Sequence, residues 1–441
     1  MITTNYQRLK EPLILTALFV VGTTIYLIKQ FSTPLLFYID GPYYYVQVKS
    51  ILSTNTLKYP DPPLTFYLLT IFSIIFSDIM YGVKIGSTIL IMLGIYPLYY
   101  LVREMSDSKT GYIVVLLYII SPALMRLSLD FIKNSIGLTF VYTSFYSLLK
   151  GVGDHRYRYL LFLSIILTGL THILDFSVLL LVIMFFSFII YYREHYIPRY
   201  IMYTIALLAL LLIGGSISTH LMGGDPNKAL SLIKNLNIHP IEPRLLGSFF
   251  YVLIILLTSI YFLYRESWGH VRYFMYALIL TLSILIIPIY PWDYTMRFLL
   301  EATILAYIPI GYLIGRIKNS SKILIGILLI TFTIPGFINQ WIEAKPSISL
   351  EEYYEIKDLI NKTDQNIVFV IHDPRLRYWF ETLTFNIVDD PKDAPPDKEL
   401  IIVFDRPIRH PLPPGSRLVY NGKFIHAYHI PHSPLYDKMS S

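Results

Sequence analysis

The sequence predicts an all-α polytopic membrane domain followed by a small α/β domain at the carboxyl end. Hydrophobic residues make up 54% of the 441 residues and charged residues only 15%, whereas a soluble domain averages about 25% charged residues. The mean hydropathy is +0.54. This apolar character stops near Trp341, and a tail that reads as a soluble domain follows from Pro346. The chain therefore carries more apolar sequence than one water-soluble core could bury.

Eleven stretches are long and apolar enough to be candidate membrane spans, since a span needs about 20 mostly apolar residues. They lie near 12–29, 84–102, 110–126, 132–149, 158–172, 174–191, 200–217, 246–264, 273–290, 297–315 and 323–340. We interpret the first as an uncleaved span, because no small-residue cleavage site follows it. A further apolar stretch at 64–76 has 13 residues, which is short for a crossing.

The distribution of basic residues indicates how these spans are oriented, since cytoplasmic loops carry an excess of Lys and Arg. If 64–76 does not cross and the N-terminus is cytoplasmic, the inner segments hold 14 Lys and Arg in 56 residues, and the outer segments hold 10 in 108. If it does cross, basic clusters such as Lys150, Arg156 and Arg158 move outside. We therefore expect 64–76 to lie at the outer interface.

Two domains follow from this topology. We expect a transmembrane domain over 1–341 with a large first outer loop at 30–83, and an extracytoplasmic α/β domain over 346–441. The protein would then be a multi-pass protein of the cell membrane with a cytoplasmic N-terminus. The net charge of +6 needs no nucleic-acid partner, because basic residues flank membrane spans in any case. The absence of cysteine excludes disulfides and thiol catalysis.

Local patterns predict the elements of the tail. Leu350 to Ile360 is typical of a helix, with Ser347 or Ser349 as its cap. Two short runs rich in β-branched residues, 366–371 and 399–404, are typical of buried strands. Asn421-Gly422 between 417–420 and 423–429 indicates a hairpin. At His372-Asp373-Pro374 we favour a turn capped by the aspartate over a ligand contact.

The stretch Phe37-Tyr-Ile-Asp-Gly-Pro-Tyr-Tyr-Tyr45 places one carboxylate, Asp40, just outside the first span and next to three tyrosines. A carboxylate on a turn at the membrane surface, beside aromatic rings, suits a site for a sugar or a cation. The alternative is an interfacial aromatic belt with a solvated aspartate.

Further polar residues fall on the same predicted outer side. They are Asp130 before the fourth span, His172 and Asp175 in the turn between the fifth and sixth, Asp225, His239, Glu242 and Arg244 in the loop 217–245, and Asp293 and Arg297 at the start of the tenth. A group of acidic and histidine residues on one side of the membrane can bind a divalent cation or supply a general base for an acceptor hydroxyl. Arg297 suits a lipid-linked phosphate. The simpler readings are a helix cap for Asp130, a polar contact between helices for His172 and a snorkelling side chain for Arg297.

The chain resembles the GT-C superfamily of integral membrane glycosyltransferases, which use polyprenyl- or dolichyl-phosphate-linked sugars. The resemblance covers roughly 1–150. It rests on Asp40 after the first span, on Pro60-Asp-Pro-Pro-Leu-Thr-Phe-Tyr67, and on Asp130 before Lys133-Asn-Ser-Ile-Gly137, where oligosaccharyltransferase catalytic subunits carry a second acidic motif. It implies that Asp40 is a catalytic or acceptor-orienting carboxylate and Asp130 a second carboxylate. We add Arg297, Tyr43, Tyr44 and Asp293 as residues for substrate or lipid phosphate.

The implied reaction moves a sugar from the lipid-linked donor to a glycan, lipid or protein acceptor on the outer face. A divalent metal, Mg²⁺ or Mn²⁺, would be held by Asp40, Asp130, His172 and Asp175, the last two added from position alone. The tail lacks the Trp-Trp-Asp motif of oligosaccharyltransferases and the second motif has one acid, so we favour a monosaccharide or small-glycan transferase. An oligosaccharyltransferase is the alternative, and a transporter or a membrane scaffold would be a different class.

Overall fold

In the computed structural model, residues 2–217, 234–238, 240–364, 366–395, 398–405 and 415–430 are described. They form two compact units. The first unit comprises Met1–Phe31 and Tyr59–Ala344, and the second comprises Ser32–Lys58 and Lys345–Ser441. Asp225 and His239, predicted on the outer side, lie outside the described residues, as does the side chain of Asp293.

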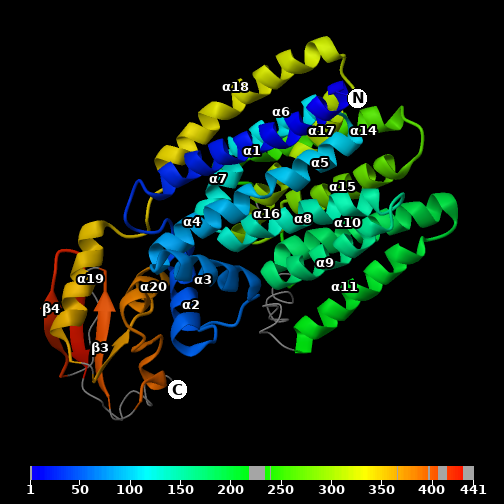
Figure 1. The fold of residues 1–441 in the computed structure, drawn as a ribbon. Coiled ribbons are helices and arrows are strands. Elements are labelled where there is room, and N and C mark those ends of the chain that lie inside the picture. Colours follow the sequence, from blue (N-terminus) through cyan, green and yellow to red (C-terminus); the bar gives the residue numbers. More distant parts are fainter. Residues whose placement is uncertain are drawn as a thin grey trace. The chain divides into compact units, whose positions relative to one another are not determined.

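The first unit is a bundle of helices (Figure 1). Its first helices are α1 (Ile2–Gln30), α3 (Leu64–Phe76), α4 (Ile79–Met92), α5 (Ile95–Met105), α6 (Ser108–Ile119), α7 (Pro122–Leu129), α8 (Ile132–Lys150) and α9 (Arg156–Thr171). They are followed by α10 (Ile173–Glu194), α11 (Arg199–Ile217), α14 (Pro243–Tyr264), α15 (His270–Ile286), α16 (Trp292–Leu305), α17 (Tyr307–Gly315) and α18 (Asn319–Glu343). Each predicted span coincides with one of these helices or with two consecutive ones.

The predicted all-α membrane domain with a small tail domain is confirmed, but the count of eleven spans is not. Six helices of the described part are long and apolar enough to cross a membrane, or seven if α6 and α7 form one span bent by 51°. The bend follows Ile120, where Ser121 caps α7 and Pro122 occupies its first turn. A proline cannot continue the hydrogen-bond ladder of a preceding helix. The short apolar helix α3 ends at Phe76, followed by Ser77 in the left-handed region with φ of 51°.

The span that contains α16 and α17 lies at the centre of the first unit. Within Tyr294–Gly315, 83% of the apolar window is buried, compared with 11% for α18 and 17% for the first span. The outer helices α1 and α18 pack side by side through Tyr26 and Phe337, whose ring centroids are 6.4 Å apart. Side chains on α16 are therefore surrounded by other helices, and α18 presents most of its apolar surface outward.

The second unit combines the tail with one helix from early in the chain. Its elements are α2 (Asp40–Thr54), α19 (Leu350–Lys362), β1 (Ile367–Val370), α20 (Pro374–Leu383), β2 (Ile387–Val388), η1 (Pro391–Asp393), β3 (Glu399–Phe404), β4 (Arg417–Asn421) and β5 (His426–Ile430). The sheet order is β2-β1-β3-β5-β4. Strand β1 pairs parallel with β2 and β3, and β5 pairs antiparallel with β3 and β4. The predicted helix, strands and hairpin are all present; α20 and β2 were not predicted.

Alternating side chains divide the sheet into two faces. Val368, Val370, Leu400, Ile402 and Ile430 form one buried cluster. Phe369 points to the other face and packs against Phe380 of α20, with ring centroids 5.4 Å apart. Ser349 and Glu352 form the capping box of α19, and Asp373 caps α20 by accepting from the Arg375 amide, as the favoured interpretation of His372-Asp373-Pro374 expects.

Helix α2 packs on α20 within this unit. The Nζ of Lys49 donates to the carbonyl oxygens of Glu381 and Thr382, both at 3.0 Å. Lys58 pairs with the buried Glu381 carboxylate at 2.8 Å. Because both lysines also lie over the ring of Phe385, α2 is held by directed contacts as well as by apolar packing. The contacts of the segment at 32–58, predicted as part of the first outer loop, are thus with the tail.

One carboxylate joins α19 to the β4–β5 hairpin. Glu355 accepts hydrogen bonds from the amides of Lys423, Phe424 and Ile425 at 2.8, 2.9 and 3.0 Å. We predict that Glu355→Ala destabilises the second unit by about 2–4 kcal/mol, because bonds to a charged acceptor are stronger than average. Hydrogen exchange of the Phe424 and Ile425 amides should then accelerate.

Glu351→Ala is the matched control, since this carboxylate pairs with Lys423 while both side chains are 70% exposed. It should change stability by less than about 0.5 kcal/mol. Unchanged exchange in Glu355→Ala would show that the turn does not depend on this carboxylate.

Candidate active site

A network of buried polar side chains joins α8, α10 and α16 in the first unit. Asp175 and Glu301 are 0% exposed and Asn134 is 1% exposed. The amide nitrogen of Asn134 donates to Asp175 Oδ1 at 3.1 Å and to Glu301 Oε2 at 2.6 Å. His172 Nδ1 lies 2.9 Å from Asp175 Oδ2. We call these four residues, Asn134, His172, Asp175 and Glu301, the buried network.

The two carboxyl groups of the buried network are joined by the Asn134 amide, which donates to both of them. Buried carboxyl groups are costly in a low-dielectric site unless polar groups contact them. Among the described residues, Asn134 Oδ1 and Glu301 Oε1 are buried without a hydrogen-bond partner, so the network retains acceptor capacity for a water or a ligand hydroxyl.

Local sequence explains why these residues meet. His172 lies between α9 and α10 in an extended conformation, with φ of −157° and ψ of 134°, and Asp175 follows in the first turn of α10. Asn134 lies in the first turn of α8. The positive ends of two helix dipoles therefore meet at the network, and this favours an anionic group between them.

Cationic side chains lie near the network. Lys133 precedes Asn134 on α8 and forms an ion pair with Asp61. Arg297, one turn before Glu301 on α16, lies over the ring of Phe131 with its guanidinium carbon 4.3 Å from the centroid. Each cation is thus next to a network residue on its own helix, Lys133 beside Asn134 and Arg297 one turn from Glu301. Two cations and the helix dipoles make this region suitable for a phosphate group.

Asp130 lies at the end of α7, two residues before α8. Its carboxylate pairs with Arg126 at 2.8 Å, and its side chain is 7% exposed. The residue at the N-cap of α8 is Phe131, whose side chain makes no capping hydrogen bond. Phe131, which follows Asp130 in the chain, contacts Arg297 through its ring. The carboxylate of the second motif and the predicted phosphate-binding arginine therefore lie in the same region.

The residues predicted around Asp40 belong to the second unit. Asp40 is the first residue of α2, where the positive end of the helix dipole stabilises a carboxylate by about 0.3–1 kcal/mol. Tyr38, two residues earlier, has φ of 54°, and its amide bonds to the Lys345 carbonyl at 3.0 Å. A non-glycine residue in this region is held there by its surroundings.

The two predicted tyrosines have different environments. Tyr44 is 2% exposed and packs edge to face on Tyr43, with ring centroids 5.7 Å apart. Tyr43 is half-buried, accepts a hydrogen bond from Gln47 at 2.9 Å and contacts the ring of Tyr378 at 5.4 Å between centroids. Tyr43 and Tyr378 thus form an aromatic pair, and Tyr43 is three residues after Asp40 in the first turn of α2.

His172 and Asp175 do not fit a metal site in this arrangement. Both oxygens of Asp175 are engaged by hydrogen bonds, from Asn134 and with His172. No group of three or more His, Cys, Asp or Glu within the described ranges could hold a metal ion. Metal use by Asp40 and Asp130 stays a prediction, and we derive no step through a metal.

Sequence reasoning missed Asn134 and Glu301 as site residues. Glu301 carried a usable signal, because an acid within an apolar span is functional by default. Asn134 stood in the quoted run Lys133-Asn-Ser-Ile-Gly137, but the two acids that it joins lie 41 and 167 residues away in the chain.

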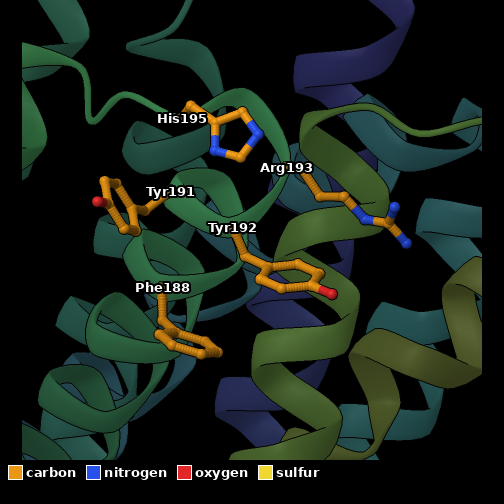
Figure 2. Close-up of a pocket in the computed structure, with 5 residues that line it drawn as sticks. All are labelled: Phe188, Tyr191, Tyr192, Arg193 and His195. Carbon is orange, nitrogen blue, oxygen red and sulfur yellow. The ribbon is translucent and has the colours of Figure 1, made fainter.

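A hollow of ≈ 530 Å³ lies at the other end of α10 and is lined by Phe188, Tyr191, Tyr192, Arg193 and His195. Figure 2 shows these side chains on the last turns of the helix. Phe188, Tyr191, Tyr192 and His195 follow the i, i+3, i+4, i+7 spacing of one helix face, and the three aromatic residues are at least 56% exposed. Arg193 stacks on Trp268 at 3.7 Å. This composition is typical of an aromatic belt at a membrane interface.

Comparisons with known proteins agree with the predicted class. A family model described as dolichyl-phosphate-mannose-protein mannosyltransferase matches residues 60–218. The apo crystal structure of the Archaeoglobus fulgidus oligosaccharyltransferase matches with a TM-score of 0.64 and 12% identity, over 89% of this chain and 69% of that one. The same enzyme in complex with Zn and sulfate matches with a TM-score of 0.60 and 16% identity, over 86% and 63%.

ArnT from Cupriavidus metallidurans bound to undecaprenyl phosphate matches with a TM-score of 0.60 and 10% identity, over 95% of this chain and 97% of that one. No curated protein matches the sequence. At these identities the structural likeness establishes the fold, and the family match over 60–218 agrees with it. These findings support the predicted resemblance to the GT-C superfamily of membrane glycosyltransferases.

The contribution of the buried network to stability can be tested by removing the Asn134 amide, which donates to both acids. We predict that Asn134→Ala lowers the stability of the first unit by about 2–4 kcal/mol, because two buried acids lose a shared donor. Glu301→Gln should cost less, since its amide can still accept from Asn134 and hydrogen-bond to Asp175. Thermal unfolding in lipid nanodiscs would measure both effects.

Ser144→Ala on the same helix is the control, because it removes one buried hydrogen bond to Ser164 of 2.8 Å. It should cost about 1 kcal/mol or less. If Asn134→Ala proved no more harmful than Ser144→Ala, the bridge would not be holding α8, α10 and α16 together.

Proposed function

We propose that this protein transfers a monosaccharide from a polyprenyl- or dolichyl-phosphate-linked donor to an acceptor on the outer face of the membrane. The observation that carries the proposal is that two cations, Lys133 and Arg297, stand next to residues of the buried network on α8 and α16, where helices α8 and α10 begin. This arrangement suits the phosphate of a lipid-linked sugar. The undecaprenyl phosphate bound to ArnT, which has the same fold, supports the donor class.

The reaction follows from the roles of the side chains. A carboxylate, Asp40 by resemblance, accepts the proton of the acceptor hydroxyl as that oxygen bonds to the anomeric carbon. The bond between this carbon and the phosphate oxygen breaks, and the lipid phosphate leaves with the bonding electrons. Arg297 and Lys133 stabilise the charge that develops on the leaving phosphate. Attack opposite to the departing phosphate inverts the anomeric carbon.

The motifs of the chain favour a small transferred unit. The second acidic motif holds one acid, Asp130, and residues 346–441 contain no Trp-Trp-Asp motif. The second candidate is an oligosaccharyltransferase-like protein glycosylation enzyme, which the fold also allows. A hexose or a pentose is the expected sugar, and the acceptor is a glycan, a lipid or a protein.

The main test is sugar transfer by the purified full-length protein in lipid, from a panel of polyprenyl-phosphate sugars. We predict that Asp40→Asn lowers kcat by about 10²–10⁴-fold, the usual contribution of a general base. Asp154→Asn is the control, because this carboxylate is partly exposed and pairs only locally with Arg156; it should retain full activity.

A chelator arm tests the predicted Mg²⁺ or Mn²⁺, and the oligosaccharyltransferase crystallised with Zn and sulfate is a reason to include it. Loss of transfer with the chelator and recovery with added metal would establish metal use. If wild type consumes no donor from the panel and Asp40→Asn behaves identically, the transporter or scaffold hypothesis gains over the enzyme.

The phosphate role of Arg297 gives a separate prediction. Arg297→Gln should raise the KM for the lipid-linked donor by about 10–100-fold, the cost of losing a charged hydrogen bond to phosphate. Arg244→Gln at the start of α14, where the side chain is 89% exposed, is the matched control and should leave this KM unchanged. Equal donor KM values in the two variants would remove Arg297 from the phosphate site.

A further inference from the structure

A second hollow lies beside the first turn of α16. It has a volume of ≈ 670 Å³ and is lined by Lys234, Asn235, Leu236, Asn237, Pro240, Pro291, Trp292 and Thr295. All of these belong to the first unit. We call it the Trp292 hollow. Its volume is within the range of pockets for small organic ligands.

The lining combines a flat aromatic surface with hydrogen-bonding groups. The Trp292 side chain is 43% exposed. Asn235 and Lys234 are exposed and make no hydrogen bond with the rest of the described chain. An indole ring offers a large rigid face, and an amide offers both donors and an acceptor. These two groups suit a sugar ring, because its apolar C–H face can stack on the indole and its hydroxyl groups can hydrogen-bond to the amide.

The walls of the hollow are held in place by the loop that precedes α16. The amide of Asn237 donates to the Ile289 carbonyl at 3.0 Å. Thr295 Oγ1 donates to the Tyr290 carbonyl at 2.8 Å. The rings of Tyr290 and Phe298 pack edge to face with centroids 4.7 Å apart. These contacts fix Trp292 on a folded turn.

The same helix connects this hollow to the candidate active site. Trp292 and Arg297 are five positions apart on α16, which corresponds to a rise of about 7.5 Å along the helix axis and a rotation of about 140° around it. A substrate whose phosphate meets Arg297 therefore reaches Trp292 when its sugar part, or the acceptor that approaches it, extends around the first turn of α16.

We propose that the Trp292 hollow is a carbohydrate subsite, in which a sugar ring stacks on Trp292 and hydrogen-bonds to Asn235. The inference rests on the proposed function and deepens it by naming the substrate class of this site. The ring belongs either to the acceptor glycan or to the transferred sugar of the donor. With one cationic side chain in its lining, the hollow takes neutral or weakly anionic saccharides.

Enzyme kinetics distinguish whether the bound sugar ring belongs to the acceptor or to the donor. Trp292→Ala should raise the KM of one substrate by about tenfold, the loss expected for an aromatic stacking contact together with its burial, while kcat at saturation is retained. A rise in the acceptor KM alone assigns the ring to the acceptor, and a rise in the donor KM alone assigns it to the donor. If neither KM changes, the proposal is overturned even though transfer itself is intact.

Trp292→Phe keeps an aromatic face and should recover most of the affinity, and Asn235→Ala tests the hydrogen bond without changing the helix. These variants keep the test decisive if Trp292→Ala does not fold. Trp268→Ala is the matched control, since that indole is 42% exposed and lies on the segment between α14 and α15; it should leave both KM values unchanged.

Binding can also be measured without turnover. Methyl glycosides of glucose, mannose, galactose and N-acetylglucosamine would be titrated against the intrinsic fluorescence of the wild-type protein in nanodiscs. Saturable quenching that is lost in Trp292→Phe but kept in Trp268→Phe supports the subsite, even if no donor of the panel is consumed. Absence of quenching together with unchanged KM values would overturn it.

Discussion

The first unit depends on one buried amide. Asn134 donates to carboxyl groups from two other helices, and each of those groups is removed from solvent. Because an unpaired acid in this position would cost several kcal/mol, the three helices must meet in a single register. That register also places Arg297, one turn from Glu301 on the most deeply buried span. The polar contacts that hold the bundle together thus also orient the predicted phosphate-binding side chain.

Much of the fold followed from local patterns. The cap at Ser349, the Asn421-Gly422 hairpin and the apolar stretches of the bundle are each determined by neighbours in the chain, and the structure has an element at every one of these places. The number of membrane crossings could not be predicted from local patterns in the same way. Helices such as α6 and α7 are too short alone and bend at Ser121-Pro122, and composition does not tell a bent span from two separate helices.

The site was only partly predictable, because its partners are distant in sequence. Position relative to the spans was enough to single out Asp130, His172, Asp175 and Arg297. The pairing of Asp130 with Arg126 is local, four residues apart, but the contact of Asp175 with Asn134, 41 residues away, was not foreseeable. Tyr44 was predicted as a substrate-binding residue because it is close to Asp40 in the chain, but its side chain is buried. Proximity in sequence to a candidate carboxylate does not tell a binding residue from a buried one. Tertiary packing decides between these outcomes, and a single sequence does not contain it.

The second unit is discontinuous in the chain, since Ser32–Lys58 joins Lys345–Ser441. During synthesis α2 emerges before the whole of 59–344, long before α20, its packing partner, exists. The polar contacts of Lys49 and Lys58 can form only after synthesis has passed Thr382. The helix that begins at Asp40 is therefore made early but acquires these contacts more than 300 residues later.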